Sequence, residues 1–274
     1  MSNTTPRVRR AADLLLNRRP VVIGHRGFAA RAPENTLPSF TLALEAGAEV
    51  VELDYHATRD GVPVVIHDET LDRTTDAVAR WGGEGIRVAD RTAAEIRELD
   101  AGGWFGPGTP ATHVPRLEEA ISLIQGRAVA MLERKGGDAA ATSRVLRQGG
   151  WIERVVVHSF DWDFLRELHR KEPGLVLGGL GPPEPGEPGA VATGQEALTC
   201  ALVEVIHATG ARIVGWNRHV TVESVRHAHS LGMKVWVYTV NDPPLARRLL
   251  GQGVDGLISD DPLLMLRETA AWNG

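Results

Sequence analysis

The sequence predicts a (β/α)8 TIM barrel, and three observations support this α/β fold class. Eight short apolar runs recur through the chain, and helical patterns separate most of them. Several of these runs are rich in Val and Ile without strict alternation, which is typical of parallel strands buried on both faces. A length of 274 residues is enough for one barrel-sized unit. We therefore treat residues 1–274 as a single barrel domain.

The elements follow one another in a regular order. The predicted strands are Val21–His25, Val50–Asp54, Val129–Glu133, Val155–His158, Leu175–Leu180, Arg212–Trp216, Val235–Val240 and Gly256–Ser259. The predicted helices are Leu37–Ala46, Leu117–Gln125, Asp138–Gln148, Asp161–Lys171, Glu196–Thr209, Val222–Leu231 and Pro243–Gly251. Glycines such as Gly47 and Gly210 follow several of the helical patterns, where this residue commonly ends a helix.

An open, doubly wound sheet is the alternative fold for this alternation. That fold usually carries a glycine-rich phosphate loop after its first strand. The segment Gly24-His25-Arg26-Gly27 is not such a loop, so the pattern favours the barrel.

One apolar run interrupts the alternation of strands and helices. Val62–Ile66 follows the second strand after only four residues, a connection that can make a hairpin but is too short for a parallel crossover. We expect this run to pair antiparallel to the second strand and to overhang the mouth of the barrel. From about Leu71 to Pro115 the helical pattern lapses and glycines cluster. This predicts a small insertion after the second barrel strand, about residues 71–115.

A second irregular stretch, Gly178–Gly189, contains four prolines. Because it follows a strand, we expect it on the face of the barrel that carries active sites, where it would form a rim or lid. A stiff, solvated connector is the alternative interpretation.

The composition argues against some classes of function. A formal net charge of −5 and a pI near 6.1 argue against nucleic-acid binding, which needs a basic surface. Cys200 is the only cysteine, so no internal disulfide can form, which suits a reducing cytosol. The apolar run Leu14–Leu16 is too short for a signal peptide or a membrane span. We therefore predict a soluble cytoplasmic protein without stable membrane anchoring; the oligomeric state stays open.

Carboxylates stand at the ends of two predicted strands. Residues two apart in a strand face the same side, so Glu52 and Asp54 point together, and Glu133 ends another strand. Three carboxylates without thiols suit one hard divalent cation, Mg²⁺ or Ca²⁺, better than zinc. Solvated surface charge is the alternative for any single acid, but it explains the two strand ends together less well.

Two basic side chains complete the expected charge of this site. Two unit charges about 5 Å apart at an effective dielectric near 20 interact by roughly 3 kcal/mol, so three bare carboxylates would repel a phosphodiester. A dication together with Arg26 and Lys135 leaves one net positive charge, which accepts a monoanion. Lys135 lies two residues beyond Glu133 on the same strand face, where it can bind developing negative charge.

Two histidines end neighbouring elements of this region. His25 ends the first strand and His67 follows the overhanging run, so both could reach one centre. Histidine changes protonation near neutral pH, and a pair can act as general acid and general base. A structural role is the alternative for a lone strand-end histidine, and we assign that role to the other eight, including His158. The residues together predict metal-assisted hydrolysis of a phosphodiester.

These residues belong to motifs that resemble the glycerophosphodiester phosphodiesterase family in content and order. The resemblance covers roughly Val21 to Leu264. The motifs are His25-Arg26-Gly27, Pro33-Glu34-Asn35-Thr36, Glu52-Leu53-Asp54, Thr58-Arg59-Asp60-Gly61, His67-Asp68, Leu71-Asp72-Arg73-Thr74-Thr75, Glu133-Arg134-Lys135, Ser159-Phe160, Thr239-Val240-Asn241 and Gly253-Val254-Asp255-Gly256.

The resemblance implies a (β/α)8 barrel that hydrolyses a small anionic glycerophosphodiester to sn-glycerol 3-phosphate and an alcohol. By motif, the family's roles fall on one group of residues: His25 and His67 as the acid–base pair, Glu52, Asp54 and Glu133 as metal ligands, Arg26 and Lys135 as phosphate binders, and Glu34 and Asn35 as groups that orient their neighbours. Two routes remain open, attack by the glycerol 2-hydroxyl through a cyclic phosphate and direct attack by water.

The chain also departs from the family pattern. Tyr238 stands where tryptophan is common before Thr-Val-Asn, and it keeps an aromatic face that could bind substrate. Trp216, at the end of the sixth strand, could supply another aromatic wall. Barrel packing is the alternative for both residues.

Two other functions compete with glycerophosphodiester hydrolysis. A lysophospholipase D would use the same metal centre with an apolar groove, in which Trp104 and Phe105 could take part. A non-catalytic binding protein on the same barrel is the second alternative, and the retention of all seven polar site residues argues against it.

Overall fold

Eight parallel strands close into a barrel in the computed structural model, which describes residues 10–183 and 197–272. The strand β1 pairs with β9 on one side and with β2 on the other, which closes the sheet. The barrel strands are β1 (Val21–Gly24), β2 (Val50–Ala57), β4 (Val129–Arg134), β5 (Val155–Ser159), β6 (Val176–Gly181), β7 (Ile213–Trp216), β8 (Lys234–Val237) and β9 (Gly256–Ser259). The predicted (β/α)8 fold is confirmed.

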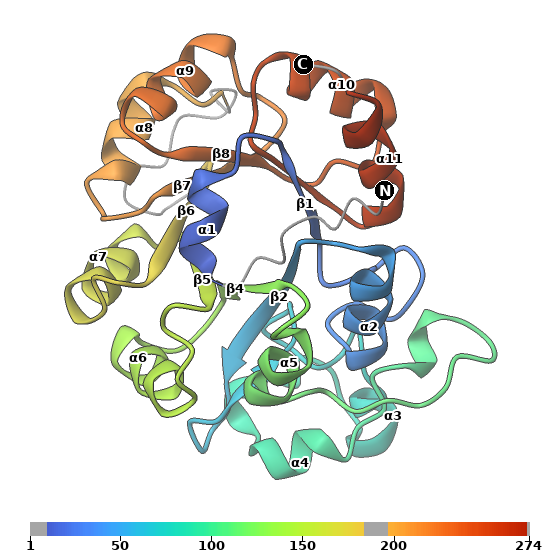
Figure 1. The fold of residues 1–274 in the computed structure, drawn as a ribbon. Coiled ribbons are helices and arrows are strands. Elements are labelled where there is room, and N and C mark those ends of the chain that lie inside the picture. Colours follow the sequence, from blue (N-terminus) through green and yellow to red (C-terminus); the bar gives the residue numbers. More distant parts are fainter. Residues whose placement is uncertain (1–9, 184–196, 273–274) are drawn as a thin grey trace.

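Helices form a ring around the barrel (Figure 1). They are α2 (Leu37–Ala46), α5 (Leu117–Ile124), α6 (Ala139–Gln148), α7 (Trp162–Lys171), α8 (Cys200–His207), α9 (Val222–Ser230), α10 (Pro243–Gly251) and α11 (Pro262–Ala271). The predicted start of the helix before β7, at Glu196, lies outside the described residues. Residues 184–189 of the proline-rich stretch also lie outside them. No helix within the described ranges is both long and apolar enough to cross a bilayer.

The strands alternate between two apolar layers. In β2, Val50 packs inside the barrel, whereas Val51 and Leu53 pack outward against the helices. This register turns Glu52 and Asp54 inward. In β4, Met131 faces inward, so Glu133 does as well, two residues further on. An apolar floor therefore lies below a polar layer at the carboxyl ends of the strands.

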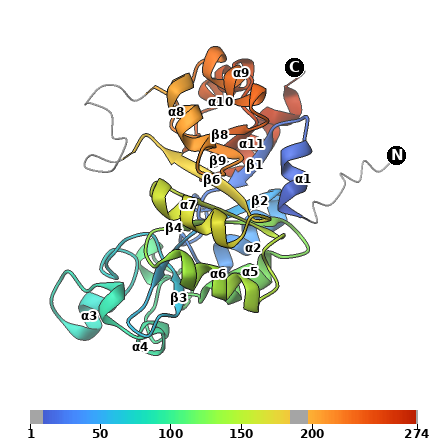
Figure 2. The same cartoon turned by 90° about the vertical axis from the view of Figure 1, so that its left-hand side faces the viewer.

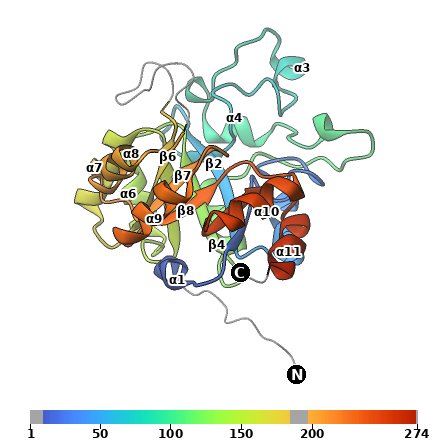
Figure 3. The same ribbon diagram turned by 90° about the horizontal axis from the view of Figure 1, so that it is seen from above.

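A short helix covers the amino end of the barrel. Helix α1 (Ala11–Leu16) inserts Ala11 and Leu14 into the same cluster as the inward-facing strand residues. Figure 3 shows it at the opposite end of the barrel from α3. This helix is not predictable from the sequence, because six residues carry too little periodicity to reveal an amphipathic face.

The connection between β2 and α5 is long and has its own small core. It begins with β3 (Pro63–Val65), which pairs antiparallel to β2 as predicted. Next come α3 (Ala77–Trp81), η1 (Val88–Asp90), α4 (Ala93–Arg97) and η2 (Gly103–Phe105). Ile66, Leu71 and Ile96 belong to an apolar cluster separate from the barrel core. We call residues 66–116 the mouth segment, and Figure 2 shows it far from α1.

Candidate active site at the carboxyl ends of the strands

A cavity of about 280 Å³ opens at the carboxyl ends of the barrel strands. Seven of the predicted site residues line it: His25, Arg26, Glu52, His67, Glu133, Lys135 and Tyr238. His158, Phe160, Leu180, Thr239 and Ile258 complete its wall. Side chains from β2, β4 and β5 and from the β1–α2 loop therefore converge with a histidine of the mouth segment on one small volume.

The β1–α2 loop is fixed against β2 by its own polar groups. Arg26 and Asn35 both have positive φ angles, +50° and +59°, a conformation that costs a non-glycine residue free energy. Hydrogen bonds compensate for this cost. The Arg26 backbone N–H donates to Glu52 Oε2 at 2.8 Å, and the Asn35 side chain donates to Asp54 Oδ2 at 2.8 Å. The Asp54 N–H donates back to Asn35 Oδ1 at 3.1 Å.

Asp54 is buried and surrounded by positive charge. Arg26 Nε lies 3.2 Å from Asp54 Oδ2, and Lys135 Nζ lies 3.5 Å from Asp54 Oδ1. Burial alone would raise the pKa of Asp54, but the charges of Lys135 and Arg26 outweigh it and lower the pKa. Asp54 is therefore an anion that holds both predicted phosphate binders at the cavity.

Three other buried groups form a candidate metal site. Ligand atoms of Glu52, Glu133 and His158 all lie within 4.8 Å of one another. Burial and the nearby charge of Asp54 raise the pKa of Glu133. Lys135 also forms an ion pair with Glu133. Glu52 and Glu133 were predicted ligands, whereas His158 was interpreted as structural. The feature that could have identified His158 as a ligand is its place at the end of β5, beside Glu133 in the sheet.

The donor atoms fit a divalent cation. Among the described residues, Glu52 Oε1 and both ring nitrogens of His158 are buried without a hydrogen-bond partner. Unsatisfied buried polar atoms are costly, and one cation would satisfy Glu52 Oε1 and one ring nitrogen of His158 at once. Asp54, the third predicted ligand, faces the same side of β2 as Glu52 but belongs neither to this group of ligand atoms nor to the cavity wall. Its carboxylate is engaged by Arg26, Lys135 and Asn35 instead.

His25 is held by a carboxylate from the far end of the chain. Its Nδ1 donates to Asp260 Oδ1 at 2.6 Å, and Asp260 follows β9, the strand next to β1. Burial lowers the pKa of His25, but the hydrogen bond to Asp260 and the charge of Glu52 outweigh burial and raise it. Because Nδ1 is engaged, Nε2 is the nitrogen available for proton transfer.

His67 has an equivalent arrangement in the mouth segment. Its Nδ1 donates to Asp68 Oδ1 at 2.6 Å. Arg73 donates to both carboxylate oxygens of Asp68, at 2.6 and 3.0 Å, and to both of Glu34, at 3.1 and 2.7 Å. Glu34 also accepts a hydrogen bond from Arg26 at 2.7 Å. This network links His67 to the β1–α2 loop through Glu34, which contacts both Arg26 and Arg73.

The two predicted aromatic binders differ in position. The Tyr238 hydroxyl donates to the Gly181 carbonyl at 2.7 Å, and its ring contacts Phe160 edge to face in the cavity wall. Trp216 is fully buried in the outer layer between strands and helices, over Gly181. Trp216 lies two residues after Val214 on β7. Because Val214 faces outward, Trp216 does as well. The placement of Trp216 corrects the expectation of a second aromatic wall and favours the packing alternative.

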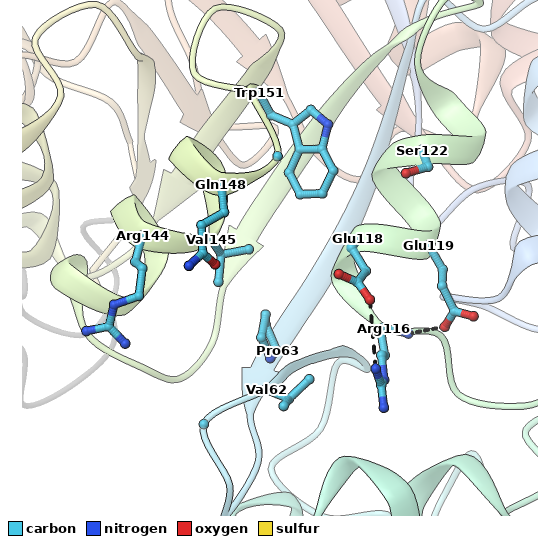
Figure 4. A pocket seen from close by; sticks show the side chains of 12 residues that line it. Val62, Pro63, Arg116, Glu118, Glu119, Ser122, Arg144, Val145, Gln148 and Trp151 are labelled. Carbon is cyan, nitrogen blue, oxygen red and sulfur yellow. Dashed lines mark hydrogen bonds and ion pairs between the residues drawn. The ribbon is translucent and has the colours of Figure 1, made fainter.

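A larger cavity, about 750 Å³, lies on the side of the barrel between α5 and α6 (Figure 4). Trp151 and Arg144 line one side, and Glu118 and Ser122 line the other. Two of its charged residues, Glu118 and Arg144, are exposed, and Arg116 pairs locally with Glu118 at 3.8 Å. None of the predicted site residues lines this cavity. Volume therefore does not indicate the reactive site; converging buried charges do.

Comparisons with known proteins identify a family for this chain. Residues 25–264 match the model of the glycerophosphoryl diester phosphodiesterase family. A glycerophosphodiester phosphodiesterase of Caldanaerobacter subterraneus subsp. tengcongensis is 34% identical over 254 residues, which cover 88% of this chain and 94% of that protein.

Solved structures show the same barrel. A glycerophosphodiester phosphodiesterase from Agrobacterium tumefaciens superposes with a TM-score of 0.74 at 29% identity, covering 90% of this chain and 99% of that one. An Oleispira antarctica phosphodiesterase, solved in complex with the product sn-glycerol-3-phosphate, superposes with a TM-score of 0.78 at 30% identity. That match covers 94% of this chain and 99% of the other.

Proposed function

This chain belongs to the glycerophosphoryl diester phosphodiesterase family, and we propose that His25 and His67 carry out its hydrolysis of glycerophosphodiesters as a general acid–base pair. Its relatives identify it as a phosphodiesterase. The proposed products are sn-glycerol 3-phosphate and an alcohol such as choline, ethanolamine or glycerol. The Oleispira antarctica relative binds that phosphate product, which supports a small anionic substrate here.

The observation that carries the proposal is the pair of histidines in one cavity. His25 and His67 both line it, and each has its Nδ1 bound to a carboxylate at 2.6 Å. Each ring therefore presents Nε2 for proton transfer, one to the leaving alcohol and one from the attacking hydroxyl or water. Asp260 and Asp68 keep the rings in that tautomer, as carboxylates do beside catalytic histidines.

Arg26 and Lys135 are the proposed phosphate binders. Arg26 is anchored by Glu34 and Asp54, and Lys135 by Glu133 and Asp54, so neither side chain must be ordered when substrate binds. Preorganised positive groups can stabilise the charge that develops on the phosphoryl oxygens. Tyr238 supplies an aromatic wall for the glycerol or head group, a role that its place in the cavity supports.

One divalent cation completes the proposed site. Glu52 and Glu133 would hold it, with Asp54 at the same strand face, and the carboxylates by themselves favour Mg²⁺ or Ca²⁺. When bound, the cation supplies Lewis acidity toward a phosphoryl oxygen. Without it the carboxylates of Glu52, Asp54 and Glu133 outnumber the positive charges of Arg26 and Lys135, which would disfavour an anionic substrate. A cytoplasmic location remains a prediction from the sequence.

A substrate panel tests the proposal. The protein, stripped with EDTA and then reloaded with Mg²⁺ or Ca²⁺, is assayed with glycerophosphocholine, glycerophosphoethanolamine, glycerophosphoglycerol and lysophosphatidylcholine. We expect metal-dependent release of sn-glycerol 3-phosphate from the first three substrates. Glu52→Gln should weaken metal binding, and excess Mg²⁺ or Ca²⁺ should partly restore activity; unchanged metal dependence would exclude Glu52 as a ligand.

Other outcomes of the panel would contradict the proposal. Equal turnover of lysophosphatidylcholine would favour a lysophospholipase D. Trp104 and Phe105, which that alternative would use, contact each other edge to face in η2 and do not line the cavity. No turnover with any cation would indicate a binding protein.

A further inference from the structure

Hydrogen bonding within the described part of the chain does not account for the buried ring of His158. Its side chain is 2% exposed, and neither ring nitrogen has a hydrogen-bond partner among residues 10–183 and 197–272. A buried histidine that packs as a core residue normally satisfies at least one nitrogen. The residue lines the cavity at the carboxyl ends of the strands, and its Nε2 lies 3.7 Å from Glu52 Oε1, so this nitrogen is the one that can face a bound ion.

The neighbouring strand makes room for this ring. Gly178 on β6 lies beside His158 in the sheet register, and a Cβ at position 178 would stand 3.1 Å from the His158 Cβ. The φ angle of Gly178 is not in the positive region that favours glycine. A glycine inside a strand weakens it and often marks a close approach. The close approach of the His158 side chain therefore explains why a glycine, and not a larger residue, fits at position 178.

The ring nitrogen lies near the oxygen atoms of two carboxylates. His158 Nε2 lies 3.7 Å from Glu52 Oε1, and the ligand atoms of His158, Glu52 and Glu133 lie within 4.8 Å of one another. Two donors bound to one ion at about 2.1 Å each lie roughly 3–3.5 Å apart, so small side-chain rotations would bring these atoms together. The main ion pairs of Asp54 are with Arg26 and Lys135.

We propose that His158 is a ligand of the divalent cation, together with Glu52 and Glu133, and that it shifts the preference of the site from Mg²⁺ and Ca²⁺ toward first-row transition ions. Imidazole nitrogen binds Co²⁺, Zn²⁺ and related ions well, whereas Mg²⁺ and Ca²⁺ require oxygen ligands. The prediction of Mg²⁺ or Ca²⁺ was based on carboxylate ligands alone. An imidazole nitrogen from His158 would make the set of ligand atoms mixed, with both oxygen and nitrogen. The inference rests on the proposed function, because it assumes that this cavity holds a metal.

The direct test observes the nitrogen–metal bond with Co²⁺ as the probe. Protein stripped with EDTA receives one equivalent of Co²⁺, and proton NMR records resonances shifted by the paramagnetic ion. We expect an exchangeable, strongly shifted signal from the ring N–H of a coordinated imidazole. This measurement needs no mutant. Wild-type protein that binds Co²⁺ without such a signal, or that does not bind Co²⁺, would overturn the inference.

The variant His158→Gln assigns the signal. Glutamine replaces the ring nitrogen with an amide oxygen, a harder ligand. We expect the shifted signal to disappear, Co²⁺ affinity to fall about 10- to 100-fold and Ca²⁺ affinity to change less than about threefold, as measured by titration calorimetry. His227→Gln, on the outer helix α9 where the ring pairs with Glu204, is the matched control and should keep the signal. Persistence of the signal in His158→Gln would show that another histidine binds the ion.

The inference and the proposed function can fail separately. Turnover of glycerophosphodiesters with Mg²⁺ or Ca²⁺, combined with no shifted signal under Co²⁺, would overturn only the role of His158. A shifted signal that depends on His158, in a protein without turnover in any metal, would overturn only the proposed hydrolysis.

Discussion

Two histidine–carboxylate pairs face the same cavity but are built by different regions of the molecule. The barrel forms the pair of His25 and Asp260, which are 235 residues apart in the chain. Each follows one of two hydrogen-bonded neighbouring strands, β1 and β9, and the His25 N–H donates to the Ser259 carbonyl at 2.8 Å. The mouth segment forms the pair of His67 and Asp68, which are adjacent in the chain.

The two regions therefore position the same chemistry by different forces. Strand pairing fixes His25, and Asn241 fixes Asp260 by donating to it at 2.5 Å and accepting from its N–H at 2.9 Å. His67 lies beyond the short strand β3, and its carboxylate partner is tied to the barrel through Arg73 and Glu34. The partner of His25 is therefore held on the neighbouring barrel strand, whereas the partner of His67 depends on side-chain ion pairs that reach across to the barrel.

The largest expected effect comes from removing either histidine. His25→Ala and His67→Ala should each lower kcat by roughly 10²-fold or more, because general acid–base catalysis typically contributes 10²–10⁴-fold. Equal losses would mean that the two supports position their rings equally well. Steady-state assays with glycerophosphocholine measure the effect, and circular dichroism checks the fold. His227→Ala, in α9, is the control.

A variant with near-wild-type kcat would remove its histidine from the proposed mechanism. Loss of activity in the control would show that the assay reports folding and not catalysis.

The barrel was predictable because its signals are local. The apolar strands and helical patterns each follow from short stretches, and the antiparallel run after β2 follows from a connection too short for a crossover. The internal order of the mouth segment was not predictable. Its short helices have few turns, and its separate core, including Leu71 and Ile96, is assembled by long-range packing.

The candidate site also has residues that were predictable from the sequence and residues that were not. Strand period places Glu52 and Asp54 together, and both stand inward as expected. In a fully apolar strand, the two-residue period does not say which alternate set of side chains faces the barrel interior. Trp216 belongs to the set that faces outward. Asp260 was missed because its partner is distant in sequence. His158 was missed because an unsatisfied nitrogen is visible only in three dimensions.

A smaller loss of activity should follow from removing the side chain that holds Asp68, the partner of His67. Arg73 forms hydrogen bonds with Asp68 and Glu34, and these partners raise its pKa, so it is a cation at all working pH values. Arg73→Ala should lower kcat about tenfold with little change in KM, because outer contacts orient the ring without binding substrate. Arg87→Ala, which removes an exposed ion pair with Glu69 in the same segment, should leave kcat unchanged. Equal effects of the two variants would contradict a positioning role.

The smallest expected effect is a shift in pH dependence from the support of His25. Burial lowers the pKa of His25, and the hydrogen bond to Asp260 is the largest influence that raises it again, to above the usual 6.5. The stabilisation of the imidazolium is therefore present below pH 6.5 and is lost as pH rises through the higher folded-state pKa. Asp260→Asn removes the charge, so the limb of the kcat/KM profile that reports His25 should move to lower pH.

The limb that moves identifies the role of His25. A shift of the alkaline limb would assign it as the general acid, because the acid must be protonated; a shift of the acidic limb would assign it as the base. Asp261→Asn is the matched control, since Asp261 caps α11 by accepting from the Leu264 N–H and asparagine caps equally well. A profile that does not move in Asp260→Asn, or that moves equally in both variants, would show that the barrel's carboxylate does not tune its histidine. The two pairs would then differ only in how their rings are held in place.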